Sequence, residues 1–326
     1  LTPFSKFEIK SDKAHKELQK ICTANIKNEV GKCIYTHMLN PDGGIETDLT
    51  VVCIDKDHFR IISSAATRER DKFHIKKYLA KDLELKDVTD DFCVFGVFGP
   101  KSRALMKSIS KDDFENDEFR FGTAKYISIE GIKIWTQRLS YVGELGFELY
   151  VRSKDAKKIY EMLIDKGKDF NLSNCGMHAM DIMRMESGFL HWGHDISPEE
   201  NQYQAGLSFT ISSKKEDEFI GKKALEKIKK EKIKSRFAMF TLKDSKPGEP
   251  LLLHDEPIYL ENNIIGRSTS GNYSFNFKKN LAFGYINNDI SNDELHKKDL
   301  FIEVEKKKYP IEITIKPLKQ TNFKNN

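Results

Sequence analysis

Alternating apolar and polar residues, which predict strands, recur along the chain between segments with the apolar period of a helix. Up to about residue 200 the two patterns are mixed without regular βαβ repetition, which favours α+β domains with mainly antiparallel sheets. The predicted strands are 4–10, 31–39, 49–54, 59–63, 91–98 and three between 121 and 151, and the predicted helices are 12–23, 67–80, 101–109, 154–168 and 177–188.

The pattern changes near residue 235 to short strands separated by turn residues, at 237–242, 256–259, 264–270, 281–286, 300–304 and 309–313. Regular spacing of this kind is typical of a small β-barrel or sandwich. The basic run 222–236 precedes it, with Leu225, Ile228 and Lys232 at the spacing of an amphipathic helix. Its charges are most simply a solvated face, because no aromatic residues are interleaved as a nucleic-acid site would need.

Three residues predict helix ends. Thr67 is a candidate N-cap for the helix 67–80, and Pro100 occupies the first turn before the helix 101–109. Gly188 is a candidate C-terminal cap for the helix 177–188.

The segment 138–152, RLSYVGELGFELYVR, combines a strand pattern with two glycines. Gly143 and Gly146 allow a tight turn and a close approach of the backbone to another group. Glu148 interrupts an apolar run, where a carboxylate is either solvated or buried with a dedicated partner. Alternation places Glu148 and Tyr150 on one face of the strand and their three apolar neighbours on the other.

Charge and composition exclude several classes of protein. The 54 basic and 50 acidic side chains nearly balance at +4, whereas a nucleic-acid protein normally shows a segregated basic excess. No run is long enough to span a membrane and no signal segment is present. The five cysteines are odd in number and widely spaced, so we expect reduced thiols and a cytoplasmic location. Because the chain begins with Leu, we expect a fragment of a longer protein.

Three other chemistries lack support in the sequence. The junction Gly96-Val-Phe-Gly99-Pro100 lacks the third glycine and the spacing of a dinucleotide loop. His191 and His194 have no third ligand in sight, so we predict no metal site. Ser140 and Ser270 lack a His–Asp arrangement that would activate a nucleophile.

Six segments, in order, resemble the aminomethyltransferase (glycine-cleavage T-protein) superfamily. They are LTPFSKFEI, THMLNPDGGIETDLTV, RLSYVGELGFELY, AMDIMRMESGFLHWGHDI, FIGKKAL and TSGNYSFNFKKNLAFGYI, and together they span nearly the whole chain. The third and sixth look most like the C-terminal, folate-binding half of dimethylglycine and sarcosine dehydrogenases. The resemblance implies a three-domain clover-leaf around a central folate channel. Two of the domains are antiparallel-sheet α/β domains, at residues 1–120 and 121–234, and the first is interleaved with the second. The third is a C-terminal β-barrel at residues 235–326.

The resemblance also implies site residues. Asp48 matches the carboxylate beside the reactive nitrogens of tetrahydrofolate, and is our candidate catalytic residue. Tyr141 and Glu148 match the tyrosine and glutamate that hold the pterin, and Tyr35 matches an aromatic residue of the same pocket. Arg184, in Met-Arg-Met-Glu, matches the arginine of the family's Leu-Arg-Leu-Glu helix.

These residue types suit the implied chemistry. A carboxylate such as Glu148 pairs bidentately with an amide-like edge that carries adjacent donors, and Gly143 and Gly146 would let the ligand approach the backbone. A flat ring favours an aromatic neighbour, Tyr35 or Tyr141. From the local sequence alone, Asp48 would be interpreted as a residue that caps the turn after Gly44. The family resemblance implies instead that Asp48 takes or relays a proton during one-carbon transfer.

The implied function is tetrahydrofolate-dependent capture of the carbon of an N-methyl amine as methylene-tetrahydrofolate. This chain carries no glycine-rich dinucleotide loop. We therefore expect FAD as a cofactor only if an upstream domain is missing from this chain. A flavin dehydrogenase domain or subunit is then a partner, beside folate and the methylated amine.

Two alternatives stay open. The first is a free-standing aminomethyltransferase or methyl-donor demethylase. This chain departs from the Gly-Tyr-Thr-Gly-Glu-Asp-Gly sequence of the glycine-cleavage enzyme at three positions, which are Ser140, Val142 and Leu145. The departure weakens the case for a lipoyl-protein partner. The second is a non-catalytic folate-binding or RNA-modification-linked module, which a fold alone does not exclude.

Overall fold

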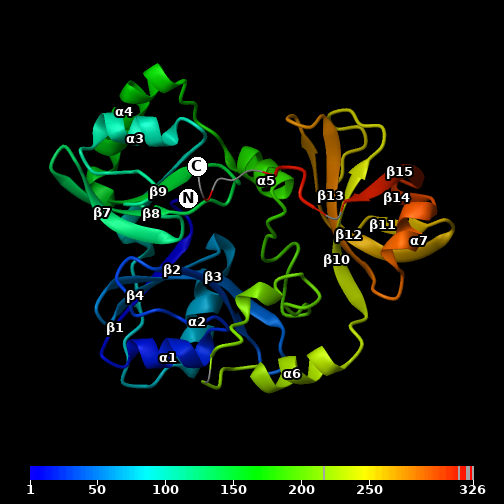
Figure 1. The fold of residues 1–326 in the computed structure, drawn as a ribbon, viewed down its shortest axis with the longest axis horizontal. Helices are drawn as coiled ribbons and strands as arrows, with labels where there is room; N and C mark the ends of the chain where they lie inside the picture. The colour runs from blue at the N-terminus through cyan, green and yellow to red at the C-terminus, as the bar shows by residue number, and fades with distance from the viewer. Residues whose placement is uncertain (216, 315, 321–323, 325–326) are drawn as a thin grey trace.

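Three antiparallel sheets organise the chain in a computed structural model that describes residues 1–215, 217–314, 316–320 and 324. Figure 1 shows the first sheet in blue, the second in cyan and green, and a barrel in yellow to red, arranged as three lobes. Two open sheets with helices and a separate β-barrel confirm the predicted α+β, three-part architecture.

The first sheet has the strand order β2-β3-β4-β1-β5. Its elements are β1 (Ser5–Lys10), α1 (Ala14–Ile21), β2 (Cys33–Leu39), β3 (Ile45–Asp55), β4 (His58–Ser63), α2 (Arg68–Tyr78) and β5 (Lys86–Asp87). Helix α1 forms because Ala14, Leu18 and Ile21 repeat at the helical period and are buried against Phe7 and Ile9 of β1.

Thr67 occupies the N-cap position of α2 but makes no capping hydrogen bond. Its hydroxyl instead donates to Asp71 Oδ2 at 2.7 Å. The prediction of Thr67 as an N-cap was therefore right in position and wrong in chemistry: the hydroxyl donates to a buried carboxylate and accepts no backbone N–H.

The second sheet has the order β6-β9-β8-β7. Its elements are β6 (Phe92–Phe98), α3 (Ser102–Ile109), β7 (Thr123–Ile129), β8 (Ile132–Arg138), β9 (Gly146–Arg152) and α4 (Ala156–Gly167). Helices α3 and α4 cover one face, onto which Phe147, Leu149 and Val151 project. Strand β6, within the range 1–120, pairs with β9 of the range 121–234. The limits of the two ranges stay a prediction.

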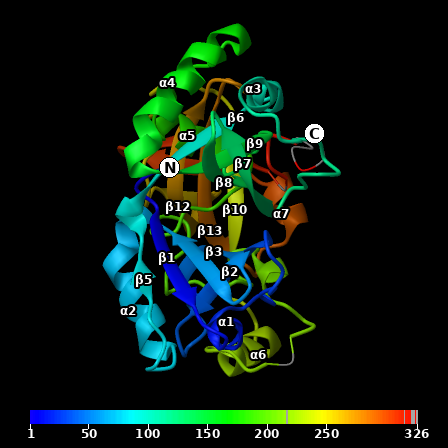
Figure 2. The same cartoon turned by 90° about the vertical axis from the view of Figure 1, so that its left-hand side faces the viewer.

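The other face of the second sheet packs against the first sheet. Cys33 and Val52 of the first sheet are buried with Val94, Trp135 and Tyr150 of the second. Figure 2 shows β6 to β9 next to β2 and β3 in the turned view. Glu148 and Tyr150 share one strand face, as the alternation predicts. That face is turned toward the first sheet, so Glu148 does not lie on the outer surface of the molecule.

The third part is a closed barrel in the order β10-β13-β12-β11-β14-β15. Its elements are β10 (Ser235–Leu242), β11 (Pro257–Leu260), β12 (Asn263–Ser274), β13 (Lys279–Asn287), α7 (Asn292–Lys297), β14 (Leu300–Val304) and β15 (Lys307–Thr314). Closure pairs the edges of the sheet, which leaves no strand edge unpaired at the seam between β10 and β15.

Two helices connect the three parts. Helix α5 (Met177–Glu186) packs through Met185 onto Leu281 and Phe283 of the barrel, and Gly188 follows it with the left-handed φ of 72° that a C-terminal glycine favours. Helix α6 (Lys222–Lys230) buries Leu225 against the first sheet. It ends before Lys232, so the predicted helix 222–236 was too long.

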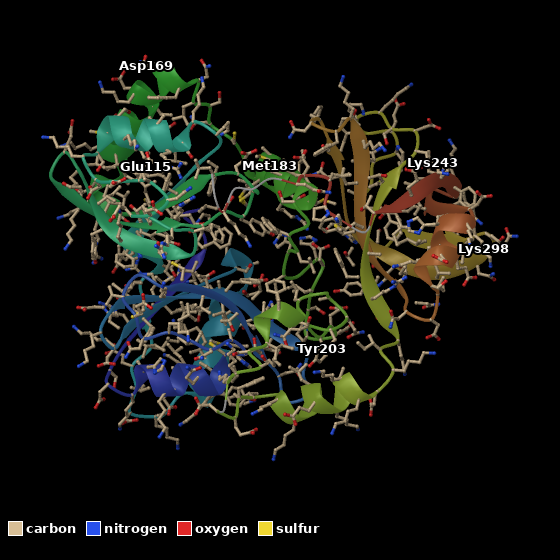
Figure 3. All side chains as sticks on the ribbon, viewed as in Figure 1. Glu115, Asp169, Met183, Tyr203, Lys243 and Lys298 are labelled. Atoms are coloured by element: carbon tan, nitrogen blue, oxygen red, sulfur yellow. The ribbon has the colours of Figure 1, made fainter. Side chains whose placement is uncertain are left out.

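Charged side chains are spread over all three lobes. Figure 3 shows Asp169 and Lys298 at the periphery of two different lobes, whereas Met183 and Tyr203 lie nearer the centre. All five cysteines are free. Within the described residues, no helix is long and apolar enough to cross a membrane, and no group of three or more His, Cys, Asp or Glu side chains forms a metal site.

Candidate functional site

A cavity of about 1350 Å³ lies where the three parts meet. It is lined by side chains of β2, β3, β8, β9, α5 and β12, together with the loops between them. Each of the predicted site residues lines it: Tyr35, Asp48, Tyr141, Glu148 and Arg184. A smaller hollow of about 450 Å³ beside α3 contains none of them. The tertiary structure thus brings the predicted residues together, while their roles stay predictions.

Asp48 lies on β3 directly opposite His37 of β2. Its side chain is 18% exposed, and its Oδ1 atom has no hydrogen-bond partner among the described residues. Burial raises the pKa of Asp48 to about 7, Asp71 adds to the rise, and a hydrogen bond with Tyr35 opposes it. A carboxyl group with a pKa near neutrality can both accept and release a proton under ordinary conditions.

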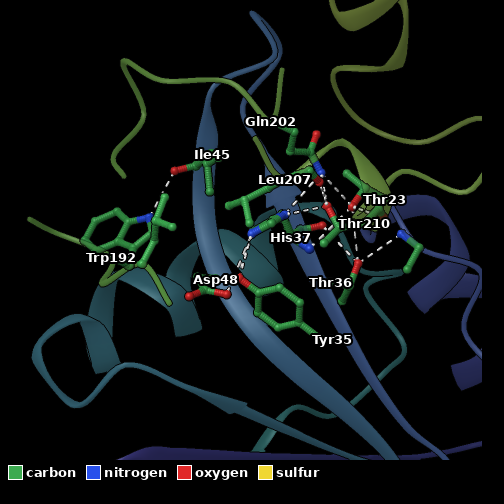
Figure 4. Close-up of polar contacts among 12 residues, drawn as sticks. Thr23, Tyr35, Thr36, His37, Ile45, Asp48, Trp192, Gln202, Leu207 and Thr210 are labelled. Carbon is green, nitrogen blue, oxygen red and sulfur yellow. Dashed lines mark hydrogen bonds and ion pairs between the residues drawn. The ribbon is translucent and has the colours of Figure 1, made fainter. Parts of the chain in front are cut away.

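His37 is a site residue that the sequence analysis missed. Its side chain is fully buried, and its Nε2 lies 3.7 Å from Asp48 Oδ1 and 3.3 Å from the Tyr35 hydroxyl (Figure 4). Burial lowers the pKa of His37 to about 3, so the ring is neutral and its contact with Asp48 is not an ion pair. One sequence signal was available: Tyr35 and His37 are two residues apart and share a strand face.

Tyr35 presents an aromatic surface to the cavity. It is 40% exposed, and its ring lies 6.4 Å from that of Phe209 and 5.3 Å from the imidazole of His37. Burial, followed by the charge of Asp48, raises the pKa of the Tyr35 hydroxyl well above its usual value. Tyr35 therefore acts at neutral pH as a hydroxyl and a ring, not as a phenolate.

Glu148 lines the cavity from the second sheet. Its Oε2 accepts a hydrogen bond from the Tyr150 hydroxyl at 3.1 Å. Burial raises the pKa of Glu148 to about 7, against the opposing effect of that hydrogen bond. Gln137 pairs with Glu148 across β8 and β9, is fully buried, and has no partner for either amide atom within the described chain. Unpartnered polar groups of this kind mark a place where a polar ligand or water completes the hydrogen bonding.

Tyr141 and Arg184 are held by other parts of the protein. The Tyr141 hydroxyl donates to the Leu190 carbonyl at 2.9 Å, and its ring stacks on Phe189. Arg184 is 2% exposed and donates to Asp181, Asp195, Ser270 and the Phe189 carbonyl. Since most of its donors are occupied, Arg184 mainly ties α5 to the barrel at the cavity wall.

The two glycines of the segment 138–152 approach side chains of the protein. A Cβ on Gly143 would lie 2.1 Å from Ser187 Oγ, and one on Gly146 would lie 2.0 Å from Cδ1 of Phe98. Neither glycine lines the cavity. The prediction that they let a ligand approach the backbone is therefore wrong: they let α5 and β6 pack closely.

Family models match both parts of the chain. The GCVT N-terminal domain matches residues 1–215, and the glycine cleavage T-protein C-terminal barrel domain matches residues 236–319. The N-terminal match covers both open sheets and α5.

Curated relatives include dehydrogenases and aminomethyltransferases. Mitochondrial dimethylglycine dehydrogenase of Rattus norvegicus is 33% identical over 98% of this chain, but the chain spans only 37% of that protein. Aminomethyltransferase of Halothermothrix orenii is 31% identical over 85% of this chain and 76% of its own length.

A solved structure shares the fold. Glycine cleavage system aminomethyltransferase T from Bartonella henselae superposes with a TM-score of 0.85 at 21% identity, over 97% of this chain and 84% of the other. With both domain models matched in order, the chain belongs to the glycine cleavage T-protein family.

Proposed function

We propose that this chain binds tetrahydrofolate in the central cavity and uses it to accept a one-carbon unit from an N-methyl amine of the dimethylglycine or sarcosine type, with methylene-tetrahydrofolate as product. The observation that carries the proposal is the pair of half-buried carboxyl groups, Asp48 and Glu148, on one cavity whose wall has unpartnered polar atoms. Membership of the family supports it.

The cavity suits a reduced pterin with a glutamyl tail. Its volume of about 1350 Å³ exceeds that of most small-ligand pockets. Glu148 and Gln137 offer neighbouring acceptors and donors on one sheet face, which matches the mixed donor and acceptor edge of a pterin. Tyr35 and Phe209 offer aromatic surface.

Each residue has a role that follows from its surroundings. Tetrahydrofolate, when bound, supplies the amine nitrogen that takes the carbon. Glu148 holds the ring through charged hydrogen bonds, since its carboxylate retains free acceptor sites beside Tyr150. Asp48 accepts or returns the proton that is exchanged when the nitrogen forms its new bond, because its pKa lies near neutral pH.

The one-carbon unit must arrive at the oxidation level of formaldehyde, which requires an oxidant. In the proposal, a flavin dehydrogenase domain or subunit that carries FAD oxidises the amine. Relatives named as dimethylglycine dehydrogenase, more than twice as long as this chain, support that part.

The alternative reaction is transfer by a free-standing aminomethyltransferase, which the Halothermothrix orenii relative favours. The test is calorimetric titration of the purified chain with tetrahydrofolate, followed by assay of methylene-tetrahydrofolate from formaldehyde and from an aminomethyl-lipoyl protein. Binding with capture of formaldehyde alone supports the demethylating role. Turnover of the lipoyl protein selects the alternative, binding without turnover selects a folate-binding module, and absence of binding overturns the proposal.

A further inference from the structure

The segment 317–319 follows the last strand of the barrel and packs against α5. Figure 1 shows the chain, in red, leaving the barrel and passing α5. Leu318 packs against the apolar cluster that joins α5 to the barrel. The backbone N–H of Lys319 donates to the carbonyl of Glu186, at the end of α5, at 2.8 Å. The backbone of the segment is thus fixed at two consecutive residues.

The side chain of Lys319 reaches from this segment to the loop 140–145, which lies between β8 and β9. Its Nζ donates to the Val142 carbonyl at 3.3 Å and forms an ion pair with the Glu144 carboxylate. The side chains of Lys319 and Glu144 are only 10% and 25% exposed. Because water and salt screen a partly buried pair less than an exposed one, this contact holds the loop more firmly than a surface ion pair would.

The Val142 carbonyl depends on Lys319 for its hydrogen bond. The Ser187 hydroxyl also lies 3.3 Å from this carbonyl, but its single proton has a shorter acceptor in the Met183 carbonyl at 2.9 Å. The ammonium group of Lys319 carries three protons, so it can serve Val142 and Glu144 together. Among the described residues, Lys319 is therefore the main donor to the backbone of this loop from outside it.

The loop carries part of the cavity wall. Ser140 and Tyr141 both line the cavity, and Tyr141 directly precedes the residue whose carbonyl Lys319 binds. The Tyr141 hydroxyl donates to the Leu190 carbonyl at 2.9 Å, which fixes the far end of the side chain. A ring held at its hydroxyl and also at its backbone has one position in the cavity. Without the backbone anchor, the ring is free to pivot about the hydroxyl.

We propose that Lys319 is a positioning residue, which fixes the loop 140–145 against α5 and so keeps the ring of Tyr141 in its place on the cavity wall. Lys319 itself does not line the cavity, so it acts on a ligand only through the loop. The end of the barrel chain thereby determines the shape of a wall that the second sheet contributes. This inference rests on the proposed function in one respect, the contact of Tyr141 with bound tetrahydrofolate.

The first measurement follows the loop itself, in the absence of folate. Hydrogen exchange, read by mass spectrometry on peptides that cover 140–145, compares the unmodified chain with Lys319→Met, which keeps the apolar stem and removes the ammonium group. Exchange in the loop should become about tenfold faster, because the Glu144 amide is hydrogen-bonded only within the ordered loop. Lys232→Met, which removes an exposed ion pair with Asp289, is the matched control and should not change exchange in the loop.

A second variant keeps the test decisive if Lys319→Met does not fold. Glu144→Gln removes the same ion pair from the side of the loop, and leaves the packing of Leu318 and the backbone bond of Lys319 to α5 in place. It should also speed exchange in the loop. Unchanged exchange in whichever of the two variants folds overturns the proposal.

The second measurement is a double-mutant cycle between Lys319 and Tyr141, with the Kd of tetrahydrofolate measured by calorimetry. Lys319→Met should raise Kd about tenfold on its own, but less than about twofold when Tyr141→Ala is already present, because the lysine acts through that ring. Lys319→Arg keeps a cation and should restore most of the affinity. In formaldehyde capture, Lys319→Met should raise KM and leave kcat within about twofold, since the lysine lies away from the reacting atoms.

The outcomes separate this inference from the proposed function. An equal rise of Kd in both backgrounds of the cycle, or no rise in either, overturns the role of Lys319. If exchange in the loop becomes faster in Lys319→Met but the unmodified chain does not bind tetrahydrofolate, the proposed function has failed while the anchoring of the loop stands. If tetrahydrofolate binds and Lys319→Met changes neither exchange nor Kd, the proposed function stands and this inference has failed.

Discussion

Asp48 on β3 and Glu148 on β9 line one cavity from two different sheets, and burial raises the pKa of both carboxyl groups to about 7. Their surroundings nonetheless differ. Glu148 accepts from a tyrosine hydroxyl and adjoins an unpartnered amide, whereas Asp48 has a free oxygen atom beside a neutral imidazole. The first arrangement suits the binding of a polar ring, and the second suits proton exchange.

Glu148→Gln should weaken the binding of tetrahydrofolate. Loss of a charged hydrogen bond costs about 1.5–3 kcal/mol, so Kd should rise roughly 10- to 150-fold by calorimetry. Glu161→Gln, on the outer face of α4, is the matched control and should leave Kd unchanged. An unaltered Kd in Glu148→Gln would mean that Glu148 does not contact the ligand.

Asp48→Asn should leave folate bound and slow the formation of methylene-tetrahydrofolate. Removal of a general acid or base usually lowers turnover by about 10²- to 10⁴-fold. Single-turnover assays with formaldehyde separate this loss from binding. Turnover at the unmodified rate would count against Asp48 as the catalytic residue and favour a folate-binding module.

The pH dependence of stability should reveal the half-buried Glu148 carboxyl. Its pKa is raised from 4.5 to about 7 in the folded protein, so the folded state holds its proton more tightly than the unfolded state. The stability from this group is therefore complete below pH 4.5 and is lost as the pH rises through 7. Burial lowers the pKa of His37, so this residue reduces the stability of the folded protein as the pH falls below 6.5. In the unmodified protein, this effect partly cancels the pH dependence that Glu148 produces.

The difference between variants isolates the Glu148 contribution. The free energy of unfolding of the unmodified chain minus that of Glu148→Gln should fall by up to about 3 kcal/mol between pH 4.5 and 8. Urea unfolding at several pH values measures it. A difference that does not change with pH would show that Glu148 is solvated in the folded protein.

Removal of Arg184 should destabilise the fold. Arg184→Leu leaves Asp195, which is 1% exposed, without its buried charge partner, and breaking such a pair costs about 3–5 kcal/mol. Lys157→Ala, which removes an exposed pair with Glu161, should cost less than about 1 kcal/mol. Equal losses in urea unfolding would contradict the clamp role of Arg184.

Gly143→Ala should cost more than Gly131→Ala. Both glycines have left-handed φ angles, 65° and 77°, at which a side chain costs about 1–2 kcal/mol. A Cβ at Gly131 meets nothing within 4 Å, whereas one at Gly143 collides with Ser187. Thermal unfolding should rank the two variants in that order, and Ser187→Gly should recover part of the loss. Failure of this rescue would point to backbone strain alone.

Much of the local structure followed from the sequence alone. The alternation around Glu148 placed that residue and Tyr150 on one strand face. The spacing of turns past residue 235 predicted a small β-barrel or sandwich, and the structure contains a barrel. The predicted site residues all reached one cavity, although motifs implied them through a family resemblance and not through geometry. Such patterns are readable because strand and helix periods are set by the backbone over a few residues.

The tertiary structure determined the local environment of those residues. The helix from Lys222 ended at Lys230, Thr67 gave its hydroxyl to Asp71, and Gly143 made room for Ser187. His37 is removed from water only because Gln202 and Thr210, far along the chain, pack onto it. Desolvation, pKa and unpaired hydrogen-bonding groups depend on neighbours brought together by packing. The sequence thus determined which side chains are available and which strand face they share, and only the folded chain determined which of them are removed from water.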